Sequence, residues 1–412
     1  MPSLHTPQRS TSSMTWLAGL LLTTFVIGTD DFMIAGILPD IAADFGVSEA
    51  AAAQLVTVFS LVYAAAAPVM AVTTARLPRK RLIVGGLGLF AVINLATVFA
   101  PSYAALMALR VAAALVAATI SPAAFAIAGT LAPPGRTGRA IGTVAAGLTV
   151  SLVIGVPLGS WIGGGFGWHA TFVLVAALTT IAVAVTALTL PRMPETPVVS
   201  VRERLVLLRR PAVLTCVIGT IIGATSGLMP YIFIAPVIGD VSGGDRGLVP
   251  VVIGLYGLAG AAGTVIGGRL NDRWGTDRAV LALLVVVLAS TIAITVTGLV
   301  FGGLVPFWLL AALIVVWGVA GWAYNPPMNA RALQLAGPAG TEAIALNTSG
   351  LYIGIALAGA IGGGALNLAG GIAVLAAASG IGLINLVFMT VAVRRYPSKP
   401  LTQPAPTHTD SR

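Results

Sequence analysis

Two adjacent carboxylates lie inside the first long apolar segment of the chain, where charge is unexpected. Asp30 and Asp31 interrupt an apolar run at residues 16–38, and Arg110 lies inside another run at residues 103–131. Charged groups are costly within a bilayer, so they mark paths for ions, protons or substrates by default. The balance between burial and a nearby guanidinium sets whether a carboxylate holds its proton. The chemistry that these residues could perform is therefore proton binding and release.

The carboxylates and the arginine are predicted to lie at similar depths. Asp31 is seven residues from Leu38, taken as the outer end of its run. Arg110 is seven residues from Tyr103, where its own run begins on the same side. At 1.5 Å per helical residue, both lie about 10 Å from that surface, so we expect Asp31 and Arg110 to pair.

Only one of the two aspartates can face the centre of a helix bundle. Neighbouring positions on a helix point about 100° apart, and we favour Asp31 over Asp30 for the central position. The alternative is that the carboxylates reach the outer interface, or that their pairing with Arg110 only fixes helix packing.

Long apolar segments must position these residues. Of 412 residues, 57% are hydrophobic and 8% are charged. An ordinary soluble domain carries about 25% charged residues, so a soluble fold is excluded. The basic residues are scattered despite a net charge of +9, which excludes a nucleic-acid-binding face. Twelve runs are long enough to cross a bilayer as helices. They lie near residues 16–38, 50–74, 82–100, 103–131, 140–166, 169–190, 211–236, 249–270, 279–301, 307–330, 343–368 and 372–393.

The distribution of basic residues predicts the orientation of these runs. With the N-terminus in the cytoplasm, 20 of the 22 Lys and Arg residues fall on the cytoplasmic side or in the tails. Both termini are therefore expected to be cytoplasmic. The polar connection at residues 191–210 divides the runs six and six, which is typical of an internally repeated membrane protein.

We predict an all-α membrane protein with twelve transmembrane helices in two pseudo-symmetric six-helix halves. The predicted segments are an N-terminal tail, the first half, a linker, the second half, and a C-terminal tail that we expect to be disordered. Their boundaries are residues 1–15, 16–190, 191–210, 211–393 and 394–412.

The chain lacks the side chains that a cofactor or an active site would need. Its single cysteine, Cys216, has no partner, and its three histidines lie far apart in the sequence. No phosphate-binding loop of the ATPase type is present. We expect no metal, no cofactor and no enzymatic activity.

Three stretches outside the first run carry recognisable motifs. The connection after the eighth run contains Gly268, Asp272, Arg273 and Gly275 in a G-x-x-x-D-R-x-G pattern. The corresponding connection after the second run keeps the basic residues Arg76 and Arg79, with Ala75 in place of the acid. The fifth run contains Gly155, Pro157 and Gly159.

These patterns resemble the major facilitator superfamily, and within it the twelve-span drug:proton antiporters. The stretch from Gly28 to Pro39 resembles a subgroup that includes chloramphenicol exporters and arabinose-efflux-type permeases. The resemblance implies proton coupling by Asp31, Asp30 and Arg110. It implies a cytoplasmic gate at Arg76, Arg79, Gly268, Asp272, Arg273 and Gly275. It also implies an antiporter motif at Gly155, Pro157 and Gly159.

Polar and aromatic side chains within the runs are candidates for a substrate cavity, which combines apolar walls with a few polar groups. They are Gln54, Thr57, Tyr63, Tyr231, Phe233, Tyr324, Asn325 and Asn347. For each one alone, hydrogen bonding between helices is the favoured explanation, so the residues indicate a cavity only as a set.

The function expected from the resemblance is proton-coupled efflux of a small, fairly apolar drug or antibiotic by alternating access. The alternative is proton-coupled export of a sugar or another small metabolite. A channel would differ in showing no dependence on an opposing proton gradient. The expected partners are a small-molecule substrate, protons and membrane lipids, with no nucleic acid. We expect a monomer in the bacterial cytoplasmic membrane.

Overall fold

The fold is entirely helical over the residues that the structure describes. The structure is a computed structural model that describes residues 14–398, except 75, 134–135, 192, 194–206, 244–246 and 303. Most of the predicted linker and of both predicted tails lies outside these residues. The elements are α1 (Trp16–Phe32), α2 (Ile34–Phe45), α3 (Glu49–Thr73), α4 (Arg79–Thr97), α5 (Tyr103–Leu131), α6 (Thr137–Val150), η1 (Ser151–Gly155), α7 (Val156–Phe166), α8 (Trp168–Thr189), η2 (Leu207–Arg209), α10 (Pro211–Ile232), α11 (Ile234–Val241), α12 (Leu248–Trp274), α13 (Thr276–Val300), α14 (Phe307–Ala323), α15 (Asn325–Ala336), η3 (Gly337–Ala339) and α16 (Gly340–Arg395).

Three of the predicted spans are broken within their length. α1 and α2 meet at Met33 with a bend of 45°. α10 and α11 meet at Phe233, and α14 and α15 meet at Tyr324. Proline explains two of these breaks, because Pro236 and Pro327 each lack the N–H that would bond to the last residue of the preceding helix.

The long helices account for most of the predicted spans. Among the described residues, ten helices are long and apolar enough to cross a membrane, or eleven if α1 and α2 form one span. α16 has 56 residues, and its backbone leaves the helical conformation at Ala369 and Gly370, so it consists of two helices. The total of twelve spans stays a prediction.

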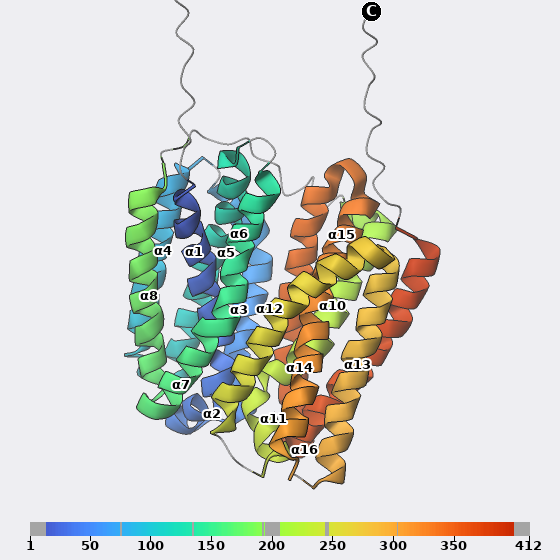
Figure 1. Cartoon of the computed structure of the whole chain (residues 1–412). Helices are drawn as coiled ribbons and strands as arrows, with labels where there is room; N and C mark the ends of the chain where they lie inside the picture. The colour runs from blue at the N-terminus through green and yellow to red at the C-terminus, as the bar shows by residue number, and fades with distance from the viewer. Residues whose placement is uncertain are drawn as a thin grey trace, which may run out of the picture.

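The helices form two groups that lie side by side (Figure 1). One contains α1–α8 and the other contains α10–α16, here called the N-terminal and C-terminal halves. α1 begins and α16 ends at the same end of the bundle, which we call the terminal end; the opposite end is the far end. The halves touch where α2 meets α11, where α3 meets α16, and where η1 and α7 meet α12.

Small residues allow the halves to approach closely on the part of these helices nearer the far end. A Cβ atom on Gly257 of α12 would clash with the backbone of Leu152 in η1. A Cβ atom on Gly359 of α16 would clash with the hydroxyl group of Thr57 in α3. Such contacts between backbones are the usual means by which helices pack in membranes.

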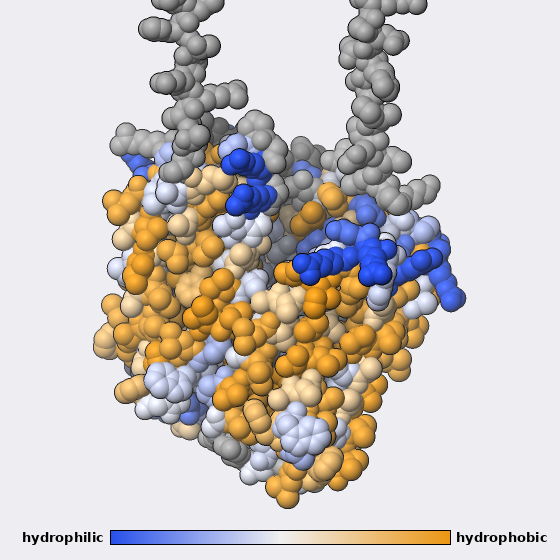
Figure 2. Space-filling model, in the orientation of Figure 1, coloured by the Kyte–Doolittle hydropathy of each residue, from blue (hydrophilic) through white to orange (hydrophobic). Residues whose placement is uncertain are grey.

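The outer surface of the bundle is mainly apolar. Figure 2 shows apolar side chains over most of the visible side face, with hydrophilic groups gathered toward the terminal end. Large exposed side chains include Phe99, Phe166 and Trp308. A surface of this kind suits contact with lipid, which leaves the polar chemistry to the interior.

Candidate functional site

The two carboxylates of the first span are buried at its break. Asp30 is 0% exposed and Asp31 is 3% exposed, and both lie in the last turn of α1. The span continues past the break as α2 to Phe45, whereas the sequence placed its outer end at Leu38. Both carboxylates therefore lie deeper than predicted, directly before the bend at Met33.

Arg110 forms its ion pair with Asp30. Its Nη1 donates to Asp30 Oδ2 at 2.7 Å, and both side chains are buried. The guanidinium carbon also lies 4.4 Å from the centre of the Phe59 ring, a cation–π contact. The predicted pair between Arg110 and Asp31 is thereby corrected. Depth in the membrane cannot distinguish Asp30 from Asp31, because the two lie only about 1.5 Å apart along the helix axis. The direction of each side chain decides which of them pairs with Arg110.

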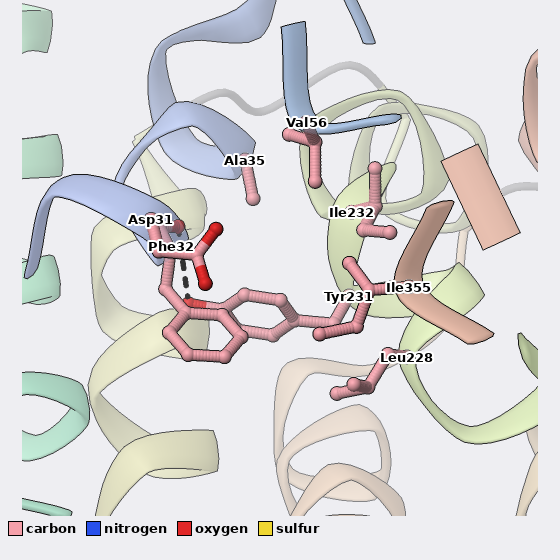
Figure 3. A pocket seen from close by; sticks show the side chains of 8 residues that line it. All are labelled: Asp31, Phe32, Ala35, Val56, Leu228, Tyr231, Ile232 and Ile355. Atoms are coloured by element: carbon pink, nitrogen blue, oxygen red, sulfur yellow. Dashed lines mark hydrogen bonds between the residues drawn. The ribbon is translucent and has the colours of Figure 1, made fainter. Parts of the chain in front are cut away.

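Asp31 instead faces the contact between the two halves. It lines a small cavity together with residues of both halves. Neither of its carboxylate oxygens has a hydrogen-bond partner among the described residues. Figure 3 shows the carboxylate beside the ring of Tyr231, whose hydroxyl donates to the carbonyl oxygen of Phe32 at 3.5 Å. Uptake of a proton would remove the cost of burying the Asp31 charge.

Three tyrosines surround this carboxylate. Tyr63 of α3 stacks on Tyr352 of α16, with 3.9 Å between the ring centres, so this contact joins the halves. Tyr231 lines the same cavity as Asp31, and Tyr63 and Tyr352 lie near this carboxylate. Of the residues predicted to line a substrate cavity, Tyr63 and Tyr231 therefore lie around Asp31.

A larger cavity adjoins the first and is lined almost wholly by the C-terminal half. Phe32 and Leu228 line both cavities. The ring of Phe32 makes edge contacts with Tyr231 and Trp322, with 5.9 Å and 6.2 Å between ring centres. The polar side chains in the lining are Thr220, Ser226, Tyr256, Trp322, Tyr324, Asn325 and Asn347.

Two of the predicted residues, Asn325 and Asn347, belong to a chain of hydrogen bonds beside this cavity. Thr220 Oγ1 donates to Asn347 Oδ1 at 2.6 Å. Asn347 Nδ2 donates to Asn329 Oδ1 at 2.9 Å, and Asn329 Nδ2 donates to Asn325 Oδ1 at 2.6 Å. Sequence analysis missed Asn329, although it lies four residues after Asn325 and so on the same helix face.

The remaining predicted cavity residues lie in contacts between helices and line neither cavity. Gln54 Nε2 donates to the carbonyl oxygen of Gly359 at 3.5 Å, and Thr57 packs against the same glycine. Phe233 is buried at the break between α10 and α11, against Gly362. Gln54 and Thr57 therefore join α3 to α16, and Phe233 joins two elements of the C-terminal half.

The glycine-rich stretch of the fifth span departs from a regular α-helix. η1 (Ser151–Gly155) is a π-helical turn, and Pro157 follows in the first turn of α7. A Cβ atom on Gly155 would clash with Thr29 Oγ1, whereas one on Gly159 would lie 3.2 Å from the methyl carbon of a threonine on α8. The π turn therefore packs directly against the helix that carries both carboxylates, and such turns are frequent at functional sites.

The predicted gating residues lie at the terminal end. Asp272 and Arg273 are exposed at the end of α12, and Asp272 accepts a hydrogen bond from Asn271 Nδ2 at 3.3 Å. Gly275 has φ 80° at the turn into α13, a conformation that favours glycine. Of the others, Gly268 is half-buried and Arg76 is exposed. Arg79 is buried at the start of α4, and Ala75 lies outside the described residues.

A second ion pair lies close to this gate, with Arg331 buried and Asp277 partly exposed, and sequence analysis missed it. Arg331 Nη1 bonds to Asp277 Oδ1, and Arg331 Nη2 donates to the carbonyl oxygens of Ala392 at 3.3 Å and Tyr396 at 2.5 Å. The backbone N–H of Ser398 donates to Asp277 Oδ2 at 2.8 Å. The pair thus ties the end of α16 to α13 and α15. Arg331 was expected only as one of many cytoplasmic basic residues.

Comparison with known proteins supports a transporter fold. The chain is 31% identical over 353 residues to the uncharacterized MFS-type transporter YbcL of Bacillus subtilis, covering 85% of this chain and 89% of the relative. It is 28% identical to the inner membrane transport protein YdhP of Escherichia coli K12, covering 91% and 95%. It is also 28% identical to a probable sugar efflux transporter of Mannheimia succiniciproducens, covering 84% of each chain.

Solved structures share the fold at low sequence identity. A bacterial homologue of the human lysosomal transporter Spinster, in an inward-facing and unoccupied conformation, superposes with a TM-score of 0.73 at 18% identity, covering 94% of this chain and 98% of that one. A mutant of the peptide transporter POT gives a TM-score of 0.75 at 15% identity, covering 92% and 94%. The family model of the Major Facilitator Superfamily matches residues 20–341. The chain therefore belongs to the Major Facilitator Superfamily of transporters.

Proposed function

We propose that the protein couples the entry of protons to the export of a small, fairly apolar molecule, such as a drug or antibiotic. The observation that carries this proposal is Asp31, a buried carboxylate whose oxygens have no hydrogen-bond partner among the described residues, in a cavity between the two halves. The charges of the neighbouring Asp30–Arg110 pair balance each other, so the charge of Asp31 is the one that a proton would remove.

Coupling follows from the charge of Asp31, which lies where the two halves meet. A protonated Asp31 carries no charge, so the apolar contact between the halves can close around it at little cost. A deprotonated Asp31 favours an opening that admits water. Phe32 lies directly after Asp31 and touches Tyr231 and Trp322, so a movement at the carboxylate reaches the larger cavity. We place the substrate in that larger cavity, whose lining combines apolar and aromatic walls with a few polar groups.

The close contacts between the halves lie nearer the far end. We propose that the terminal end is cytoplasmic and that this arrangement opens to the cytoplasm, ready to load the exported molecule. Asp272 and Arg273 are exposed here, and we propose that they close the cytoplasmic side in the opposite arrangement. The membrane would be the bacterial cytoplasmic membrane, and the working unit a single chain.

The test uses inside-out membrane vesicles that respire to build an acidic interior. Adding an exported compound should release protons from the vesicle, and the recovery of a ΔpH-sensitive dye reports that release. Chloramphenicol and arabinose serve as the first probes of the two substrate classes. The parent chain should restore fluorescence with at least one probe from a wider panel, and Asp31→Asn should not. Export that persists without a proton gradient would show that the transporter is not proton-coupled.

A second candidate function is export of a sugar or a related metabolite by the same coupling. The observation that favours it is the amide chain ending at Asn325, beside the indole ring of Trp322. Amide groups that bind hydroxyls beside an aromatic face suit a carbohydrate. One relative is named a probable sugar efflux transporter, which is consistent with this candidate.

A further inference from the structure

The larger cavity has a lining without formal charge. Among the described residues that line it, none is Asp, Glu, Lys, Arg or His. Asp31 belongs to the neighbouring cavity, with Phe32 and Leu228 lying between the two. A charged molecule that left water for such a lining would lose its hydration without gaining a counter-charge. The cavity therefore disfavours ions of either sign.

The hydrogen-bond donors of the lining indicate what it would accept. In the chain from Thr220 to Asn325, each amide nitrogen donates to the next amide oxygen. The chain ends at the NH2 group of Asn325, for which the described residues provide no acceptor. The indole nitrogen of Trp322 is buried and makes no well-aligned hydrogen bond among them, although the Tyr256 hydroxyl lies close by. A donor without an acceptor becomes costly once water is displaced from it, so the half-buried NH2 group of Asn325 and the buried indole nitrogen of Trp322 favour a ligand that brings oxygen acceptors.

The rest of the lining is apolar or aromatic. The rings of Phe32, Tyr256 and Trp322 and the side chains of Leu284 and Val287 form much of its surface. A ligand therefore needs an apolar face as well as an oxygen-bearing edge. Resting on the proposed export function, we infer that the substrate is an uncharged molecule whose hydroxyl or carbonyl oxygens bind Asn325 and Trp322 and whose apolar face lies on the aromatic rings.

The experiment compares aryl glycosides that differ chiefly in charge. Phenyl β-D-glucoside is uncharged, phenyl β-D-glucuronide carries a carboxylate, and 4-(trimethylammonio)phenyl β-D-glucoside carries a fixed positive charge. Chloramphenicol is a second uncharged probe, without a sugar. Binding to purified full-length protein is measured by calorimetry in detergent, without any proton gradient. At least one uncharged probe should bind at least about tenfold more tightly than either charged glucoside, because only the charged ones lose hydration uncompensated.

Which uncharged probe binds distinguishes the two sources of this chemistry. Preference for the glucoside indicates a carbohydrate substrate, and preference for chloramphenicol indicates an antibiotic-like one. Equal or tighter binding of a charged glucoside would overturn the inference. Failure of both uncharged probes to bind would overturn it too.

Variants of Asn325 make the test independent of any one probe. Asn325→Leu should weaken binding of the uncharged probe by about tenfold, because it removes the terminal donor. Asn325→Asp has nearly the same shape and places a negative charge in the lining, so it should admit the trimethylammonio probe that the parent excludes. Trp322→Phe should weaken binding less, since the ring remains. A matched control is Asn94→Leu, which removes a buried amide from α4 outside the cavity lining.

The result also separates this inference from the proposed function. Selective binding of uncharged probes without gradient-driven export would leave the cavity assignment standing and remove proton coupling. Gradient-driven export of the charged glucosides would support proton coupling and remove the cavity assignment.

Discussion

The first span of each half is a broken helix, and the two differ in the chemistry at the break. α1 and α2 meet at Met33, and α10 and α11 meet at Phe233, so the breaks are 200 positions apart in the chain. Two residues before its break, the N-terminal half carries Asp31 and the C-terminal half carries Tyr231. Both side chains line the same cavity. Equivalent positions in the two halves thus hold a carboxylic acid in the N-terminal half and a phenol in the C-terminal half.

The ion pairs show the same division between the halves. Asp30 and Arg110 pair beside the central cavity, where Nε and Nη2 of Arg110 have no partner among the described residues. Asp277 and Arg331 pair at the terminal end, where Arg331 also donates to two backbone carbonyls. The first pair is placed to respond to a proton nearby, and the second to hold helix ends together. We infer that the N-terminal half handles the proton and the C-terminal half handles the substrate.

The largest effect is expected when the carboxylate and the phenol at the two equivalent positions are replaced in turn. Asp31→Asn keeps the shape but cannot exchange a proton, so substrate-induced proton release should fall to background while substrate binding remains. Tyr231→Phe should keep most of the release, because the ring still packs against Phe32. The measurement is proton release from purified protein over a range of pH. Loss in Tyr231→Phe with retention in Asp31→Asn would reverse the assignment of the halves.

The next largest effect is expected at the ion pairs and concerns stability. Asp30→Asn leaves Arg110 buried without a counter-charge, so the free energy of unfolding should fall by about 3–5 kcal/mol. Asp277→Asn should cost less, because Asp277 is 18% exposed and water can partly replace it. Thermal unfolding in detergent measures both. The double variant Asp30→Leu with Arg110→Met should recover stability but not transport, whereas a purely structural pair would recover both.

Close packing against α1 provides a smaller and graded test. Gly155→Leu places bulk against Thr29 on the helix of the carboxylates, and it should reduce transport by about tenfold because a tight contact must open. Gly159→Leu should reduce it less, because a Cβ atom there meets a neighbour at 3.2 Å without a clash. Initial rates are compared at matched expression. Normal export by both variants would show that the fifth span is scaffold only.

The smallest effect is expected at the gate of the terminal end. Asp272→Asn should slow turnover by a few-fold and leave substrate binding unchanged, because its side chain is exposed in this arrangement. A cysteine introduced at Gly268, in a chain with Cys216→Ser, reports access from the terminal end. Labelling should rise in the Asp272→Asn variant. Unchanged labelling together with normal transport would remove Asp272 from the gate.

Sequence reasoning predicted the helices well because apolar length alone specifies them. It predicted that Asp30, Asp31 and Arg110 lie inside the bundle, because charges that face lipid are costly. It could not choose the ion-pair partner, because that choice depends on how α1 is rotated against α5. The contact of Asn347 with Asn329 joins α16 to α15, and no local pattern predicts such a pairing. Asp277 and Arg331 escaped notice because they lie near the predicted membrane boundary, where charge is ordinary.

The π turn at Ser151–Gly155 has a consequence for comparing the halves by sequence. The N–H of Val156 bonds to the carbonyl oxygen of Ser151, five residues back, so this ring encloses one residue more than an α-helical ring. Residues on either side of the turn are therefore out of register by one position, about 100° around the axis. An alignment of the fifth span with its counterpart at the start of α16 needs a one-residue gap there. Deleting one residue from η1 would close that gap and turn Pro157 away from α12.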